Sequence, residues 1–156
     1  MDEKVLARMQ RLCISREYCC NDMRTKVLKA LEGNEEAADE IMDALVRDRF
    51  VDDLRYASAF ARDKSSLAGW GTAKIRYALA RKGIDRSVIQ EALAEIDRVK
   101  ADSKMRSVIE AKYRSISGAP DAKIKLLRYA LGRGYAYDEV REIVDDLVRL
   151  SEDDRY

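Results

Sequence analysis

The 156-residue sequence contains no histidine and one proline, and it has no long run of apolar residues. Without histidine, the commonest general base and the usual partner of a nucleophilic serine or cysteine are missing, which disfavours most enzyme classes. No segment approaches the roughly 20 apolar residues of a membrane span, and the first four residues lack the pattern of a signal peptide. We therefore expect a cytoplasmic, non-enzymatic protein without a membrane segment.

Cysteine is also scarce, with Cys13, Cys19 and Cys20 as the three examples. An odd number of cysteines in a reducing compartment argues against a disulfide framework. A structural zinc site would need a fourth ligand, and the histidine that often supplies it is absent. We expect these thiols to fill small apolar spaces, and we expect no metal and no cofactor.

The residues that are abundant favour helices. Alanine, leucine, arginine, lysine and glutamate lose little side-chain freedom in a helix, and apolar residues recur at helical spacing almost throughout. The expected fold class is all-α, without room for a sheet. About nine helices are predicted, over residues 4–13, 22–31, 35–48, 53–65, 72–82, 86–96, 98–114, 121–133 and 138–150.

Glycines mark a repeat of roughly 50 residues. Gly83 and Gly134 each follow a basic helix end and precede another amphipathic helix, and Gly33 fits a looser version of the same unit. Glycine in this place ends a helix in the left-handed conformation. We expect a single domain of tandem three-helix repeats stacked in a curved array. The predicted repeats are 1–50, 51–97 and 98–150, followed by a polar tail at 151–156.

Acidic and basic segments alternate along the chain. Residues 32–53 carry nine acids and two bases, whereas residues 54–82 carry one acid and seven bases. Residues 98–114 and 121–135 are also basic, and residues 138–156 carry eight acids and three bases. Such a polarised surface suits a partner that carries both signs, or a protein already bound to nucleic acid, better than naked DNA.

Two adjacent carboxylates, Asp52 and Asp53, stand in the stretch FVDDLRYASAF. They are either a catalytic or metal-binding pair or the start of a helix. Asp52 has the properties of an N-cap, and Asp53 is favoured by the helix dipole in the first turn. Nothing nearby supplies the further ligands of a two-carboxylate site. The helix-start interpretation is therefore favoured.

The block Phe50-Val51-Asp52-Asp53-Leu54-Arg55-Tyr56-Ala57 is followed by a glycine-containing loop, by Lys74-Ile75-Arg76 and by Lys82-Gly83-Ile84. This arrangement resembles the central part of the RecX family, bacterial modulators of the RecA recombinase. The resemblance continues to Gly134 and its aromatic neighbour. It makes Phe50, Asp52, Asp53, Arg55, Tyr56, Gly83 and Gly134 family-motif residues for capping and packing. The sequence departs from the family at KSSLAGWGTAK, where many members have a shorter loop.

The resemblance implies three tandem three-helix units and an activity that lies in binding the RecA–DNA filament. Family members suppress ATP hydrolysis, strand exchange and filament extension by RecA. They thereby regulate DNA recombination, DNA repair and the SOS response. The expected partner of this chain is accordingly the RecA filament, with direct binding of single-stranded DNA as an open question, and the protein itself is expected to be a monomer.

Clusters of basic and aromatic residues are the candidate RecA- or DNA-binding residues. Lys74 and Arg81 share one helical face, and Lys125 and Arg128 form a comparable stripe. For each single residue, a solvated helix face is the competing interpretation. Trp70 lies between two glycines. It is either exposed, where it stacks on a base or anchors a protein interface, or folded back to plug a gap between units. The full candidate set is Lys64, Trp70, Lys74, Arg76, Arg81, Lys82, Lys125, Arg128 and Arg133.

Other functions remain open from the residues alone. An all-helical protein–protein scaffold without dependence on DNA or RecA is the main alternative. Operator binding through a helix-turn-helix is a third. An enzyme is disfavoured because the sequence has no phosphate-binding loop and no cluster of metal ligands.

Overall fold

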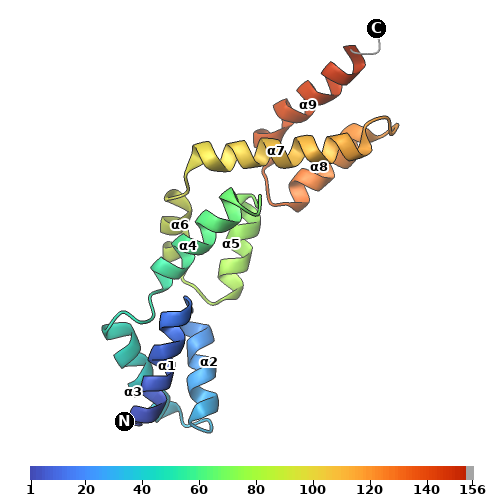
Figure 1. Cartoon of the computed structure of the whole chain (residues 1–156). Helices are drawn as coiled ribbons and strands as arrows, with labels where there is room; N and C mark the ends of the chain where they lie inside the picture. The colour runs from blue at the N-terminus through green and yellow to red at the C-terminus, as the bar shows by residue number, and fades with distance from the viewer. Residues whose placement is uncertain (154–156) are drawn as a thin grey trace. The chain divides into compact units, whose positions relative to one another are not determined.

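A computed structural model describes residues 1–153, and all regular secondary structure in this part of the chain is helical (Figure 1). The helices are α1 (Glu3–Ser15), α2 (Cys20–Ala30), α3 (Glu35–Arg47), α4 (Asp53–Ser66), α5 (Thr72–Arg81), α6 (Arg86–Ala94), α7 (Arg98–Ile116), α8 (Ala122–Gly132) and α9 (Tyr137–Asp153). The predicted all-α class is confirmed, and every predicted helix is present within a few residues of its expected ends.

The largest difference in helix ends is at the C-terminus. α9 continues through residues 151–153, which were expected in the polar tail. The rest of that predicted tail, 154–156, lies outside the described residues. None of the helices within residues 1–153 has both the length and the apolar character needed to cross a membrane.

The described chain forms two compact units. Unit 1 contains residues 1–59 and 79–92, and unit 2 contains residues 60–78 and the chain from residue 93 onward. Helices α1 to α3 belong to unit 1 and α7 to α9 to unit 2, whereas α4, α5 and α6 each contribute residues to both. The boundaries of the three sequence repeats stay a prediction.

The core of unit 1 lies among α1, α2 and α3, which pack against one another (Figure 1). Its buried apolar residues are Met9, Cys13, Tyr18, Met23, Val27, Ala38, Ile41, Met42, Leu45 and Val51. Asp2 and Asn34 cap α1 and α3, because their side-chain oxygens accept from the amides of Val5 and Ala37, both at 3.1 Å. These caps fix where two of the three helices begin.

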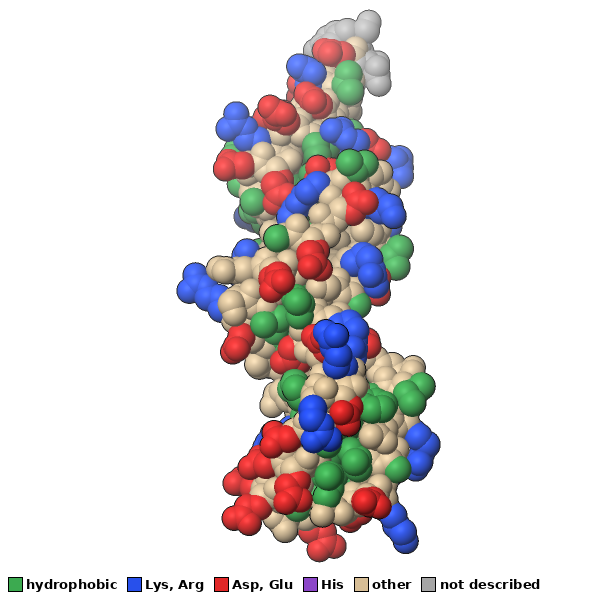
Figure 2. Space-filling model, turned by 90° about the vertical axis from the view of Figure 1, so that its left-hand side faces the viewer, with side chains coloured by type: hydrophobic (Ala, Val, Ile, Leu, Met, Phe, Trp, Pro, Cys, Tyr) green, Lys and Arg blue, Asp and Glu red, His purple; other side chains and the backbone are tan. Residues whose placement is uncertain are grey.

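Acidic side chains cover the outer face of α3. Figure 2 shows acidic side chains gathered on unit 1. The exposed acids of α3 are Glu35, Glu36, Asp39, Glu40 and Asp43. Ala38, Ile41 and Leu45 occupy the opposite, buried face. The acidic segment identified in the sequence is thus the solvent face of an amphipathic helix.

The core of unit 2 lies among α7, α8 and α9, which also pack pairwise. Its buried residues are Met105, Ile109, Leu126, Ala130, Tyr135, Val140, Ile143 and Val144. α8 and α9 meet at Gly134, which has a φ of +95°. The left-handed conformation at Gly134 reverses the chain so that α9 returns along α8 (Figure 1).

Candidate functional site

The loop between α4 and α5 brings one aromatic ring and two lysines of unit 2 together. The Nζ atoms of Lys64 and Lys74 lie 4.6 Å and 4.3 Å from the centroid of the Trp70 ring. These distances are within the range of cation–π attraction. We call Lys64, Trp70 and Lys74 the Trp70 cluster. All three are binding candidates from the sequence, and the structure places them side by side.

Trp70 is half-buried and also packs against Phe60, with the ring centroids 6.0 Å apart in a T-shaped arrangement. The Trp70 ring therefore packs against Phe60 and also attracts the ammonium groups of Lys64 and Lys74. Within the described residues, neither Lys64 nor Lys74 forms an ion pair with a carboxylate. Two positive charges thus lie near the same aromatic ring, and no carboxylate of residues 1–153 pairs with either of them.

Hydrogen bonds from the segment after α8 hold the α4–α5 loop in place. The Arg133 guanidinium donates to the carbonyl oxygens of Ala68 and Gly69, the latter at 3.0 Å. The Tyr135 hydroxyl donates to the same Gly69 oxygen at 2.8 Å, and the Gly71 amide donates to the Arg133 carbonyl at 2.8 Å. Charge-assisted bonds from arginine are among the stronger protein hydrogen bonds. The loop that carries Trp70 is therefore preorganised.

Tyr135 keeps its donor role over a wide pH range. Burial raises the pKa of the Tyr135 phenol to about 12, and the nearby Arg133 opposes this shift only in part. The hydroxyl consequently stays protonated at neutral pH and donates to Gly69. Arg133, a binding candidate from the sequence, is used here as a positioning residue for the loop.

The α4–α5 loop approaches the α8–α9 turn so closely that only glycine fits at both contact points. A Cβ atom on Gly71 would overlap the backbone of Gly134 and the amide of Tyr135. A Cβ atom on Gly134 would come within 2.5 Å of the Lys74 Cβ. The Ala73 amide donates to the Gly134 carbonyl at 3.2 Å across this contact. Gly134 thus both ends α8 and positions Lys74.

A second group of basic and aromatic side chains surrounds Tyr129 in unit 2. The Lys112 ammonium lies 5.1 Å and the Arg133 guanidinium 5.9 Å from the centroid of its ring. Lys125 forms an ion pair with Asp121 at 3.4 Å, and Arg128 is exposed on the same helix. Sequence reasoning missed Lys112, because its ring partner is on another helix; the basic character of residues 98–114 was its only signal.

The other predicted cations are not gathered at the Trp70 cluster. Arg76 is exposed on the part of α5 that belongs to unit 2, and Arg81 is exposed in unit 1. Lys82, also in unit 1, donates to Asp22 at 2.8 Å, and this bond raises the pKa of the lysine. Lys82 therefore has a partner of its own within the protein.

The two carboxylates of the central motif serve two different helices of unit 1. The Asp52 Oδ1 atom accepts from the Arg55 amide at 3.0 Å, which is N-cap geometry at the start of α4. The Asp53 Oδ1 atom accepts from the amide of Cys20 at 2.8 Å. Cys19 precedes α2 without a side-chain cap of its own, so Asp53 satisfies a free amide of that helix. The pair thus holds two helix starts together.

Arg55 continues this arrangement on the surface of unit 1. Its Nε atom donates to Glu17 at 2.9 Å, and its terminal nitrogens donate to the carbonyl oxygens of Arg49 and Phe50 at 3.0 Å and 3.3 Å. Tyr56, next in the motif, is half-buried, and burial raises its pKa. The motif from residue 50 to 56 therefore joins α1, α2, α3 and α4.

Replacing Asp53 by alanine is expected to destabilise the protein by about 1 kcal/mol, because the amide of Cys20 loses its acceptor. Asp52→Ala should cost a similar amount through the loss of the α4 cap. Urea unfolding followed by circular dichroism measures both values. Asp102→Ala, at an exposed position within α7, is the control and should stay within about 0.5 kcal/mol of the parent. Equal stability of all three variants would contradict the capping roles.

The cysteines of unit 1 are free thiols. Burial and the neighbouring Asp53 carboxylate raise the pKa of Cys20 to about 12, and burial also raises the pKa values of Cys13 and Cys19. A thiol is a good nucleophile only as the thiolate. Within residues 1–153, no group of three or more acidic or cysteine side chains is arranged to hold a metal ion.

Native Cys20 should therefore be alkylated slowly by iodoacetamide at about pH 8, where an unperturbed thiol near pKa 8.5 reacts readily. Unfolding in urea should restore ordinary reactivity. Because the folded-state pKa is raised, the contribution of this thiol to stability is present below the unfolded pKa and is lost as the pH rises toward 12. Mass spectrometry of peptides from briefly labelled protein measures the rate, and rapid labelling of native Cys20 would contradict the assigned environment.

Known proteins resemble this chain in its central region and over most of its length. Residues 52–93 match the family model for the second three-helix domain of RecX. A relative from Pectobacterium atrosepticum named "Regulatory protein RecX" is 33% identical over 144 residues, which is 82% of this chain and 88% of the relative. A relative of the same name from Clostridium botulinum is 32% identical over 121 residues, which is 75% of this chain but only 56% of the relative. The chain thus spans little more than half of that relative's length.

Two solved structures share the fold. "Crystal structure of regulatory protein RecX" aligns with a TM-score of 0.81 at 23% identity, over 92% of this chain and 71% of the other. "Crystal structure of RecX from Lactobacillus salivarius" aligns with a TM-score of 0.76 at 20% identity, over 93% and 97%. The helical fold therefore places the protein among all-α proteins. Because the Pectobacterium relative matches over most of both sequences, the chain belongs to the RecX family.

Proposed function

We propose that this protein is a regulator of the RecA recombinase that docks on the RecA–DNA filament and inhibits its ATP hydrolysis, strand exchange and extension. Membership of the RecX family is the observation that carries the proposal. In this account the protein acts in the cytoplasm as a monomer, has no catalytic centre of its own, and changes DNA repair and recombination through binding alone.

The Trp70 cluster is the proposed point of contact on unit 2. Its lysines, on α4 and α5, lie 4.6 Å and 4.3 Å from the centroid of the Trp70 ring. Arg133 and Tyr135 fix the loop that carries this ring. A preorganised pair of cations loses little entropy on binding an anionic group. The filament offers such groups as protein carboxylates and as the phosphates of bound DNA. We propose in particular that the Trp70 cluster contacts the single-stranded DNA of the filament directly.

Inhibition requires different affinities for different filament states. A ligand shifts an equilibrium only by the difference between its affinities for the two states. Two filament states matter here: an inactive state that neither grows nor hydrolyses ATP, and an active state. The protein must therefore have the higher affinity for the inactive state. Because one bound molecule can affect many subunits of a filament, inhibition is expected at less than one copy per RecA.

Single-strand-dependent ATP hydrolysis by RecA from the same organism tests the proposal. The protein is titrated in below one copy per RecA, and the expected result is a falling rate that does not depend on sequence of the DNA. An unchanged rate, with filaments verified by electron microscopy, would reject it. Salt-insensitive binding to a protein partner that is independent of filaments would then favour a helical scaffold.

A further inference from the structure

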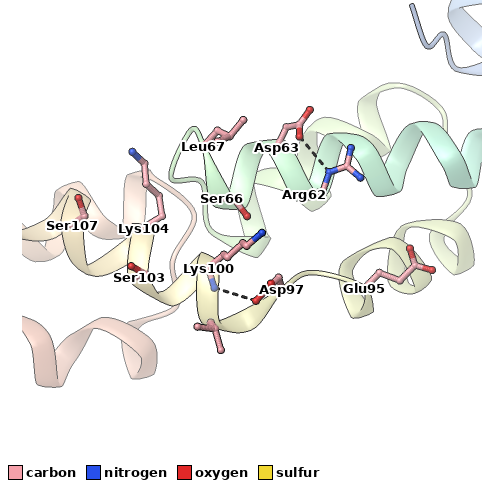
Figure 3. Close-up of a pocket in the computed structure, with 11 residues that line it drawn as sticks. Arg62, Asp63, Ser66, Leu67, Glu95, Asp97, Lys100, Ser103, Lys104 and Ser107 are labelled. Carbon is pink, nitrogen blue, oxygen red and sulfur yellow. Dashed lines mark hydrogen bonds and ion pairs between the residues drawn. The ribbon is translucent and has the colours of Figure 1, made fainter.

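A cavity of about 700 Å³ opens in unit 2 between the end of α4 and the start of α7. It is separate from the residues of the Trp70 cluster, none of which lines it. Figure 3 shows Ser66 on α4 and Lys100 on α7 pointing into the space between the two helices, with Ser103 and Lys104 further along α7. This volume is within the range of ligand-binding pockets in proteins.

Two lysines of the cavity are not paired with any of the carboxylates that also line it. Lys100 and Lys104 are one helical turn apart, and within the described residues neither forms an ion pair. The other cation, Arg62, is paired with Asp63 at 3.5 Å. Like charges at this spacing repel each other on a helix. An anionic group bound between Lys100 and Lys104 would remove that repulsion.

Exposed apolar and hydroxyl groups lie beside these lysines in the cavity. Leu67 is 72% exposed and Val99 is 80% exposed, although both are large apolar residues that line the cavity. Ser103 and Ser107, both exposed, add hydroxyl groups to the same lining. The cavity therefore combines apolar, hydrogen-bonding and cationic surface.

The carboxylates of the cavity exclude one class of partner. Asp63, Glu95 and Asp97 also line it, and Asp97 already accepts from the Lys100 amide at 3.1 Å as the cap of α7. A nucleic acid presents a continuous row of phosphates, which these carboxylates would repel. A peptide can place one or two acidic residues at the lysines and an apolar side chain at Leu67, and it can keep other charges away.

We propose that the cavity is a docking site for an acidic and apolar segment of a partner protein. Carboxylates one helical turn apart in that segment pair with Lys100 and Lys104, and an apolar side chain beside them covers Leu67 and Val99. The inference goes beyond the proposed function, because it assigns a second surface and does not require RecA. A peptide titration tests it without RecA, so the two proposals fail independently.

The test uses the full-length protein labelled with ¹⁵N and a set of synthetic helical peptides. The first peptide carries a leucine beside two glutamates at positions i and i+4; the second has glutamines in place of the glutamates, and the third has serine in place of leucine. An oligothymidylate with the same net charge as the first peptide tests whether any polyanion binds. Saturable shifts of amide resonances in residues 62–67 and 97–107 are expected with the first peptide alone, with a dissociation constant below about 1 mM.

The variant Lys100→Gln/Lys104→Gln should weaken binding of the first peptide by about fivefold or more, as two exposed ion pairs are lost. Arg106→Gln/Arg114→Gln removes the same charge from exposed positions on the same helix outside the cavity, and binding should change by less than about twofold. Absence of localised shifts, equal shifts with the glutamine peptide, or stronger shifts with the oligonucleotide would each overturn the proposal.

Discussion

Gly71→Ala is expected to lower the free energy of unfolding of the protein by about 3 kcal/mol, in the upper range for overpacked sites. The added methyl group would overlap the backbone of Gly134 and the amide of Tyr135, neither of which can move without breaking the contact between the two loops. Gly134→Ala should cost at least as much. It combines a clash with Lys74 and a φ of +95°, which a residue with a Cβ rarely adopts.

Two other glycines provide matched controls. Gly132, the last residue of α8, has no atom within 4 Å of its added Cβ and no left-handed φ, so Gly132→Ala should keep or raise stability. Gly118 also has open space but a φ of +93°, and Gly118→Ala isolates the backbone cost. Thermal unfolding measures all four variants, with about 2–4 °C expected per kcal/mol in a chain of this size. A Gly71→Ala melting temperature equal to that of Gly132→Ala would refute the close contact.

Removing both charges of the Trp70 cluster should have the largest effect on activity. Lys64→Gln/Lys74→Gln should raise the concentration needed to inhibit RecA ATP hydrolysis by about tenfold, if each lysine contributes on the order of 0.7 kcal/mol to filament binding. Glutamine is also an unbranched side chain, and its helix propensity is close to that of lysine, so helix content should not change. Lys64→Arg/Lys74→Arg should retain most of the inhibition.

Lys4→Gln/Arg8→Gln is the matched control for this experiment. Both residues are exposed on α1, and their replacement changes the net charge by the same amount. Its inhibition curve should coincide with that of the parent protein. If the Lys64/Lys74 variant inhibited as well as this control, the Trp70 cluster would have no part in the mechanism, although inhibition by another surface would remain.

Helix positions could be predicted because they depend on local spacing and local breaks. Apolar residues at helical intervals located every helix of residues 1–153, and the aligned Gly83 and Gly134 both have the left-handed φ of a helix stop. The cap at Asp52 is also local, since its partner is the amide three residues on. These features require no knowledge of which segments meet in space.

Partners distant in sequence could not be predicted. Asp53 caps a helix that begins 33 residues earlier, and Lys82 pairs with Asp22 across 60 residues. The periodicity of a helix shows which face is apolar, but it does not show which polar group lies opposite. For the same reason, the sequence does not show that Arg133 donates to the α4–α5 loop or that Lys82 pairs with Asp22. Binding by these two cations stays a prediction.

The position of the Trp70 side chain could not be predicted either, because it also depends on residues distant in sequence. Its glycines allow either an exposed or an inserted tryptophan, and sequence alone left both open. In the structure the ring packs on Phe60 while two lysines approach it, an arrangement that depends on Arg133 and Tyr135 holding the loop. Those two residues are more than 60 positions away in the sequence.

The most direct test of the central claim uses the single tryptophan of the chain. With 5-fluorotryptophan incorporated, the protein has one ¹⁹F resonance, which reports on Trp70 alone. If the Trp70 cluster is the point of contact, assembled RecA–DNA filaments should shift or broaden this resonance, and RecA without DNA should have a much weaker effect. A resonance that stays unchanged while co-sedimentation shows the protein bound to filaments would contradict the assignment of the Trp70 cluster as the point of contact.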